Sequence, residues 1–364
     1  WSQMHGNEST TTKGLFDFLN LLHSGSALAT QFLNEFTFCW IPILNPDGAT
    51  LYTRANANGV DLNRDSQDLT QPESKILRNT FERFKPDYCF NLHDQRTIFG
   101  VDMSAKPATM SFLAPSYNEE REINDSRLKA INVIAGINQV LQKYIPGQVG
   151  RFDDSFNINC IGDTFQYLGV PTILFEAGHY PNDYEREQTR KYVFISLVSA
   201  FSTISENDIV INRIEDYLNI SQNNPVFCDF LYKNIKINYD GKEKIINFAA
   251  QYKEELIDGQ IWFNAYINQI DDLEDKIKSS KNASSDWIDT LESAGGPLGM
   301  VGASLNRAKV ATQSFGGALK ATGIGLFVSL IGGLVAAFQD NENAMKKLQP
   351  LLDGIGKIFN GWKV

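Results

Sequence analysis

Apolar residues follow two spacings along the first 220 positions of the chain. Three short runs are almost continuously apolar, which is typical of strands covered on both faces, and they lie at 36–44, 87–92 and 169–175. Other stretches repeat apolar residues at helical spacing, and they lie at 13–24, 73–85, 126–144, 183–203 and 207–220. Buried strands separated by helices predict an α/β fold with a sheet between helices.

Polar residues follow each of the three predicted strands. Asn45-Pro46-Asp47-Gly48 comes after the first strand, and its residue types predict a turn. His93 follows the second strand and Glu176 follows the third. Ligands of open α/β sheets bind at the carboxyl ends of strands, so this edge is the predicted site. The first predicted helix, 13–24, follows the cluster Ser9 to Thr12, which is its expected N-cap.

The sequence pattern changes twice after residue 222. Residues 228–267 alternate apolar and polar side chains and include Asp240-Gly241, which predicts antiparallel hairpins. Residues 274–364 become rich in Gly and Ala. We therefore predict an α/β domain over 1–222, a small β appendage over 223–273 and a helical tail over 274–364.

The tail contains an uncharged segment at 321–339, which is long enough to span a bilayer as a helix. The run from Gly295 to Trp362 also resembles a phage tail tape-measure protein, in which such a segment is a Gly-rich helix. Both interpretations stay open, and membrane association with them. If this resemblance holds, the tail carries no information about the function of residues 1–222.

Composition excludes one class of partner. The chain has 364 residues, 43% of them hydrophobic, and a formal net charge of −10. Nucleic-acid binding draws on clustered Lys and Arg, so we expect no nucleic-acid partner. The four cysteines are far apart and form no Cys-x-x-Cys pair, which predicts buried free thiols and favours a cytoplasmic location.

The first ten residues carry the clearest candidate chemistry. His5 and Glu8 are three positions apart, and imidazole with carboxylate is a ligand pair that suits zinc. The motif is short and is weak evidence alone. It is followed in order by Asn45 to Gly48, then by Asn58-Gly-Val-Asp-Leu-Asn-Arg64, Phe90-Asn-Leu-His-Asp94 and Ile173-Leu-Phe-Glu-Ala-Gly178.

Together these motifs resemble the carboxypeptidase A-like zinc metallopeptidases over about residues 1–220. The resemblance implies a mixed eight-stranded-type sheet whose first strands are missing, and therefore a chain without its natural N-terminus. It also implies one zinc ion and a role for each of the following residues: His5, Glu8 and His93 as zinc ligands, Glu176 as general base, Arg54 as oxyanion stabiliser, Asn63 and Arg64 as carboxylate-binding residues, and Asp61 as the residue that orients His5.

The sequence departs from the family pattern at two positions. Asn7 stands where many relatives have Arg. No tyrosine lies where the substrate-capping Tyr is expected, and Phe152 in that neighbourhood could cover a substrate without donating a hydrogen bond. Classical removal of a C-terminal residue from a peptide is the leading hypothesis. A deacylase or amidohydrolase acting on N-acyl amino acids, and a non-catalytic phage tail protein, are the alternatives.

Overall fold

The computed structural model describes residues 1–102, 104–206, 212–239 and 242–270. The chain divides into two compact units. The first contains Trp1–Asp229 together with Glu254–Asn264, and the second begins with Phe230–Lys253 and continues from Ala265. The predicted boundaries near 222 and 273 stay predictions.

The first unit is built on a mixed four-stranded sheet with the order β1-β5-β3-β4. Its strands are β1 (Cys89–Asp94), β3 (Met110–Leu113), β4 (Val149–Arg151) and β5 (Thr172–Ala177). β1 and β5 are parallel, β3 is antiparallel to β5, and β4 is parallel to β3. A separate pair of short strands, β2 (Phe99–Val101) and β6 (Asn223–Pro225), lies beside it.

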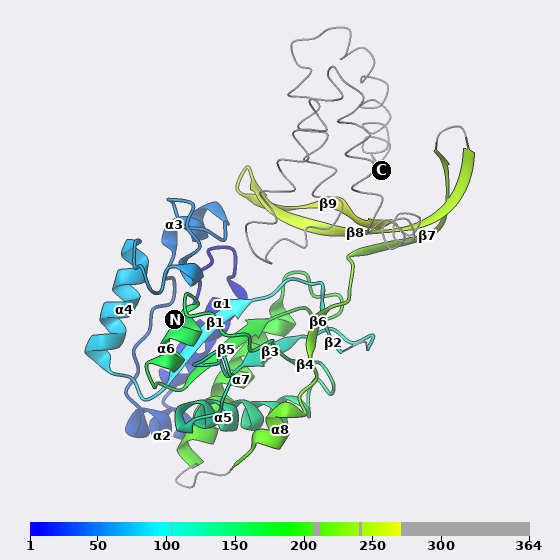
Figure 1. Ribbon diagram of the computed structural model, residues 1–364. Helices are drawn as coiled ribbons and strands as arrows, with labels where there is room; N and C mark the ends of the chain where they lie inside the picture. The colour runs from blue at the N-terminus through cyan, green and yellow to red at the C-terminus, as the bar shows by residue number, and fades with distance from the viewer. Residues whose placement is uncertain (103, 207–211, 240–241, 271–364) are drawn as a thin grey trace. The chain divides into compact units, whose positions relative to one another are not determined.

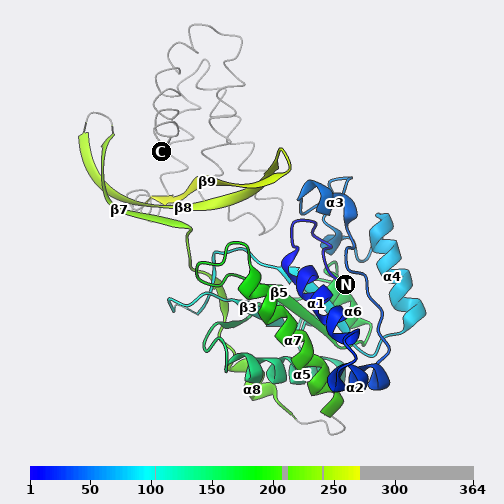
Figure 2. The same cartoon turned by 180° about the vertical axis from the view of Figure 1, so that it is seen from behind.

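Helices cover both faces of this sheet, as the two views in Figures 1 and 2 show. One face packs against α1 (Thr10–Leu22), α5 (Asp125–Leu141) and α7 (Glu187–Glu206), and the other lies beside α4 (Pro72–Phe84) and α6 (Ile161–Tyr167). The remaining helices are α2 (Ala27–Glu35), α3 (Pro46–Leu51), η1 (Leu62–Arg64) and α8 (Ile214–Leu218). The predicted α/β class, with a mixed sheet between helices, is confirmed, although four strands are described in place of eight.

Most of the predicted helices and two of the three predicted strands are present, with small shifts at their ends. The third predicted strand, 36–44, is wrong, because this stretch forms no regular strand. Its last part does hydrogen-bond to the start of the chain: Ser2 donates to the carbonyl of Ile41, and Leu44 donates to the carbonyl of Ser2. A strand needs a paired neighbour along its length, and only the 41–45 end has one here.

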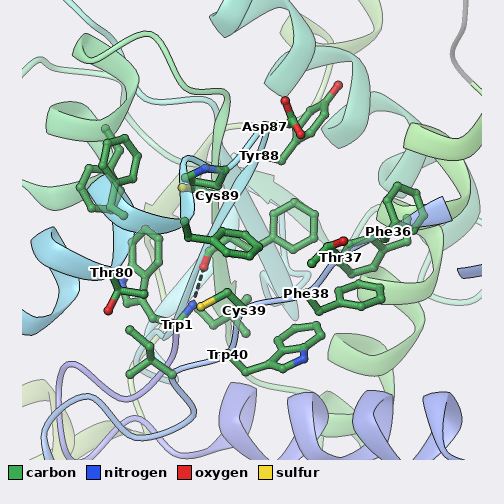
Figure 3. A pocket seen from close by; sticks show the side chains of 18 of the residues that line it. Trp1, Phe36, Thr37, Phe38, Cys39, Trp40, Thr80, Asp87, Tyr88 and Cys89 are labelled. Carbon is green, nitrogen blue, oxygen red and sulfur yellow. Dashed lines mark hydrogen bonds between the residues drawn. The ribbon is translucent and has the colours of Figure 1, made fainter. Parts of the chain in front are cut away.

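Residues 36–41 instead line a cavity of about 450 Å³ between them and the edge of β1. Figure 3 shows aromatic rings around this cavity, including Phe36, Phe38 and Trp40. The backbone amine of Trp1 lies at its edge and donates a hydrogen bond of 3.0 Å to the carbonyl oxygen of Phe90. The apolar run of the sequence is therefore explained by partial burial around a cavity, not by strand pairing.

Two further local predictions need correction. Asn45 to Gly48 is the beginning of α3 rather than a simple turn: Asn45 Oδ1 accepts from the backbone N–H of Gly48, and Pro46 occupies the first helical turn. Of the four cysteines, only Cys89 is buried, so the prediction of buried thiols is wrong for the other three.

A separate antiparallel sheet consists of β7 (Phe230–Tyr239), β8 (Lys242–Ile257) and β9 (Gln260–Ile270), which confirms the predicted hairpins. Asp258 and Gly259 connect β8 to β9 with φ angles of 50° and 75°. Two consecutive positive φ angles are what a tight two-residue hairpin turn requires. Asp240-Gly241 lies outside the described residues, as do the segment 321–339 and the tape-measure-like tail. No helix in the described part of the chain is long and apolar enough to cross a membrane.

Candidate metal centre

The candidate metal ligands come from two elements. His5 and Glu8 lie in the loop before α1, where the N–H of Glu8 donates to the carbonyl of His5 and closes a tight turn. His93 is the fifth residue of β1. This loop approaches the start of α3 so closely that a Cβ on Gly6 would lie 1.9 Å from the carbonyl carbon of Gly48. Only glycine fits at position 6, so the backbone path of the metal loop is fixed by that contact.

The side chains of His5, Glu8 and His93 converge. His5 Nδ1 lies 2.8 Å from Glu8 Oε1, His93 Nδ1 lies 2.7 Å from Glu8 Oε2, and the two Nδ1 atoms are 3.1 Å apart. Donor atoms around a tetrahedral zinc ion are separated by about 3.3 Å, given Zn–N distances near 2.0–2.1 Å. Within the described residues this is the group of His, Cys, Asp and Glu side chains whose geometry could hold a metal ion.

The chemistry of this donor set fits zinc. Two imidazole nitrogens point at each other across 3.1 Å beside a carboxylate, so the lone pairs of three side chains meet in one buried volume. A divalent cation satisfies all of them at once, with a fourth position left open. Burial lowers the pKa of His93, which favours the neutral imidazole that a metal needs. The side chains present therefore fit a zinc ion, the metal that the family resemblance implies, and binding of one ion stays a prediction.

Asp61 and Arg54 surround this cluster. Asp61 Oδ1 lies 3.0 Å from His5 Nε2, the ring nitrogen that faces away from the ligand cluster. Arg54 Nε donates to Asp61 Oδ2 at 3.0 Å, and its Nη1 reaches Glu8 Oε1 at 3.4 Å. Burial would lower the pKa of His5, but the carboxylates of Asp61 and Glu8 raise it overall. Burial would likewise raise the pKa of Glu8, but the two imidazoles hold it far below its usual value.

Glu176 lies opposite the cluster on the neighbouring strand. It is register partner to His93 in the parallel pair of β1 and β5, so the two side chains leave adjacent strands at the same level. Its Oε2 is buried and has no hydrogen-bond partner among the described residues. Burial, with the nearby charges of Glu8 and Asp94, raises the pKa of Glu176 well above its usual value. A carboxylate in this environment readily takes up a proton.

Two of the predicted substrate-binding residues, Asn63 and Arg64, lie beside the start of α6, and the third, Phe152, directly follows β4. Asn63 Oδ1 accepts from the backbone N–H of Ile161 at 3.0 Å, so this side chain holds the start of α6. Arg64 is exposed, and its Nη1 lies 2.7 Å from the carbonyl of Asn63 and 3.1 Å from Cys160 Sγ. The ring of Phe152 lies beside that of Phe99, with centroids 5.7 Å apart and planes tilted by 46°. Substrate binding by Asn63, Arg64 and Phe152 stays a prediction.

Three supporting residues were not found from the sequence. Asn45 Nδ2 donates to the carbonyl of Met4, next to His5. The carboxylate of Asp94 accepts from the backbone N–H groups of Thr10 and Thr11 at the start of α1, whereas Ser9, the predicted cap, makes no side-chain cap. Arg186 Nη1 donates to two backbone carbonyls beside the site. For Asn45, its place at the start of the Asn-Pro-Asp-Gly motif was an available signal, but Asp94 and Arg186 act across long sequence separations.

The fold and this site define a mixed α/β domain with a candidate His–Glu–His metal centre beside the carboxyl ends of β1 and β5. Residues 2–117 match the family model of the zinc carboxypeptidases, which confirms the resemblance that the motifs predict. Carboxypeptidase 2 of Trichophyton tonsurans is 25% identical over 153 residues, which is 42% of this chain and 27% of that protein. The chain thus spans about a quarter of the length of this curated relative.

Solved structures with a similar arrangement include a succinylglutamate desuccinylase from Silicibacter sp. TM1040, with a TM-score of 0.40 and 10% identity over 73% of this chain and 75% of that one. Another is a murein-tripeptide amidase from Escherichia coli O157, with a TM-score of 0.30 and 18% identity over 54% of this chain and 79% of that one.

Proposed function

We propose that residues 1–222 form a zinc-dependent hydrolase that cleaves an amide bond next to a free carboxylate, most simply the last peptide bond of a peptide. One observation carries the proposal: each pair among the side chains of His5, Glu8 and His93 approaches within 3.1 Å, while Glu176 is paired with His93 across two parallel strands. The family match and the curated carboxypeptidase relatives support the same class of reaction.

His5, Glu8 and His93 would hold the zinc ion, which would supply a Lewis acid to the reaction. Glu176 then accepts a proton from the attacking water at its buried Oε2 and delivers it to the leaving amine nitrogen. Its raised pKa suits this exchange, because a carboxyl group with a raised pKa can hold the proton between the two transfers.

Arg54 stabilises the negative charge that develops on the carbonyl oxygen of the substrate. Its guanidinium is held by Asp61 and reaches Glu8, so it is positioned at the edge of the ligand cluster before a substrate binds. Arg64 provides a planar donor group for the free carboxylate of the substrate, since a guanidinium can bind both carboxylate oxygens. Asn63 supports this binding because its side chain accepts a hydrogen bond from the N–H of Ile161 and so holds the segment that contains Cys160 and Ile161.

The free carboxylate is common to two substrate classes, peptides and N-acyl amino acids. A direct comparison of one peptide with one N-acyl amino acid, at equal zinc saturation, separates a carboxypeptidase from a deacylase. Hydrolysis of the peptide with a much higher kcat/KM supports the carboxypeptidase proposal, and the reverse result assigns the deacylase alternative.

The general-base role has its own test. Glu176→Gln keeps the shape of the side chain but removes the proton acceptor, so turnover should fall by about 10²–10⁴-fold while zinc still binds. Glu185→Gln, an exposed carboxylate on the loop that follows β5, is the matched control and should leave turnover unchanged. Full turnover by Glu176→Gln would refute the proposed mechanism.

A further inference from the structure

Arg186 joins the ends of the two central strands. Its Nη1 donates to the carbonyl of Gln95 at 3.0 Å and to the carbonyl of Ala177 at 3.2 Å. Gln95 follows His93 by two residues, and Ala177 follows Glu176 directly. One guanidinium nitrogen therefore ties the backbone beside a metal ligand to the backbone beside the general base.

The backbone of Arg186 is strained in this position. Its φ angle is 61°, in the left-handed region that residues with a Cβ rarely adopt. Such strain persists where the surrounding contacts outweigh it. The two hydrogen bonds to carbonyl groups are contacts of this kind, since they are charge-assisted and partly buried.

Asp94 makes a second connection, between β1 and the metal loop. Its carboxylate accepts from the N–H of Thr10 at 2.7 Å, from the N–H of Thr11 at 3.0 Å and from the hydroxyl of Thr11 at 3.1 Å. Its own backbone N–H donates to Glu8 Oε2 at 3.2 Å. Asp94, which lies on β1, thus caps α1 and also donates a hydrogen bond to the carboxylate of Glu8.

The two connections also involve charged groups that lie near one another. Glu8, Asp94 and Glu176 bring three carboxylates into one partly buried region. Arg186 places a positive charge near both Asp94 and Glu176. Arg186 therefore offsets part of the repulsion within the site in addition to its hydrogen bonds.

From these contacts we infer that Arg186 and Asp94 are positioning residues of the hydrolytic site. Asp94 fixes the loop of His5 and Glu8 against His93, and Arg186 fixes His93 against Glu176. The inference rests on the proposed hydrolysis, because it assigns these residues to the same reaction. Displacement of a catalytic group by about 1 Å can cost on the order of 10²-fold in rate, so the loss of either connection should be measurable.

The test compares five single substitutions, one of them a control, with the wild-type protein, with zinc affinity, kcat, KM and urea unfolding measured for each. Arg186→Met removes both carbonyl hydrogen bonds, and Arg186→Lys keeps the charge and one donor group. Asp94→Ala removes the cap of α1, and Asp94→Asn keeps its size and one acceptor oxygen. Arg190→Met is the matched control, because Arg190 is an α7 arginine paired with Asp17 and Glu187 on the outer surface.

Arg186→Met should lower kcat by about 10–100-fold with KM and zinc affinity within about threefold of wild type, and Arg186→Lys should recover much of the loss. Asp94→Ala should weaken zinc binding by about 10–100-fold, with Asp94→Asn between it and wild type. Arg190→Met should change neither kcat nor zinc affinity.

The inference is overturned if Arg186→Met keeps wild-type kcat, if Arg190→Met loses as much as Arg186→Met, or if Asp94→Ala binds zinc as wild type does. A wild-type protein that hydrolyses no substrate would contradict the proposed function instead. In that case the zinc affinities of the Asp94 variants still decide whether Asp94 positions the metal loop.

Discussion

His5 Nε2 lies 3.0 Å from Oδ1 of Asp61, 56 residues further along the chain. This contact fixes which ring nitrogen of His5 is free to face Glu8 and His93, because the Nε2 position is already occupied by the carboxylate. It also makes the imidazole a stronger ligand, since the neighbouring negative charge increases its basicity.

Replacement of Asp61 by Ala should therefore weaken zinc binding by about 10–100-fold. The affinity can be measured by competition with a chromophoric chelator. Replacement of the exposed Asp68, which lies on the following loop, is a control that should leave the affinity unchanged. Equal zinc affinity for Asp61→Ala and wild type would show that His5 needs no such support.

Arg54→Ala should lower kcat by about 10²–10³-fold at saturating zinc, because it removes the positive charge placed to stabilise the oxyanion. Arg83→Ala, an exposed arginine on α4, controls for the change in net charge and should have no effect. Turnover close to that of wild type in Arg54→Ala would exclude Arg54 from this role.

Asp163 makes the stability of the domain depend on pH. Burial raises the pKa of this carboxyl from 3.8 to about 6 in the folded protein, and the side chain is only 8% exposed. Because the folded state holds the proton more tightly than the unfolded state, stability should be highest below about pH 4 for this group and should fall as pH rises to about 6. The loss at higher pH is on the order of 1–3 kcal/mol.

Asp163→Asn removes this titration and should raise the free energy of unfolding at pH 8 relative to wild type, with little difference at pH 4. Urea unfolding across this pH range measures it. Asp125→Asn, at the first turn of α5, is a control that should keep the pH dependence. A wild-type slope retained in Asp163→Asn would assign the dependence to another group.

Phe18 is the centre of an aromatic cluster in the main core. It is fully buried, and its ring lies 5.0 Å from Phe201 and 6.1 Å from Phe32. Phe18→Ala should destabilise the domain by about 3–5 kcal/mol, because it leaves a cavity among these rings. Phe16→Ala, on the same helix but 46% exposed, should change stability by less than about 0.5 kcal/mol. Similar losses for both variants would contradict this description of the core.

The parts of this fold that the sequence predicts are those with a strong local signal. The helix that contains Phe18 shows helical spacing, and β1 and β5 are continuous apolar runs that end in His93 and Glu176. The local pattern gives a wrong prediction where strand pairing decides the structure. Residues 36–44 are as apolar as β5, but they are hydrogen-bonded to a neighbouring segment only near their end. β3, with four residues, is too short to give a clear period.

The residues of the candidate site likewise divide into those with a local sequence signal and those without one. His5, Glu8, His93 and Glu176 could be proposed because each stands in a short motif and the motifs occur in a fixed order. Asp94 and Arg186 could not be assigned from local sequence. The groups that they hold, the start of α1 and the carbonyls of Gln95 and Ala177, are distant in the chain or belong to the backbone. Only the folded arrangement reveals such contacts.

The most direct test of this account is the position of zinc in a crystal of the protein grown with the metal, located by anomalous scattering at the zinc edge. We predict one ion within about 2.0–2.2 Å of His5 Nδ1, His93 Nδ1 and a carboxylate oxygen of Glu8. Zinc bound at other side chains, with these three left without it, would contradict the assignment of the metal centre and the hydrolytic function with it.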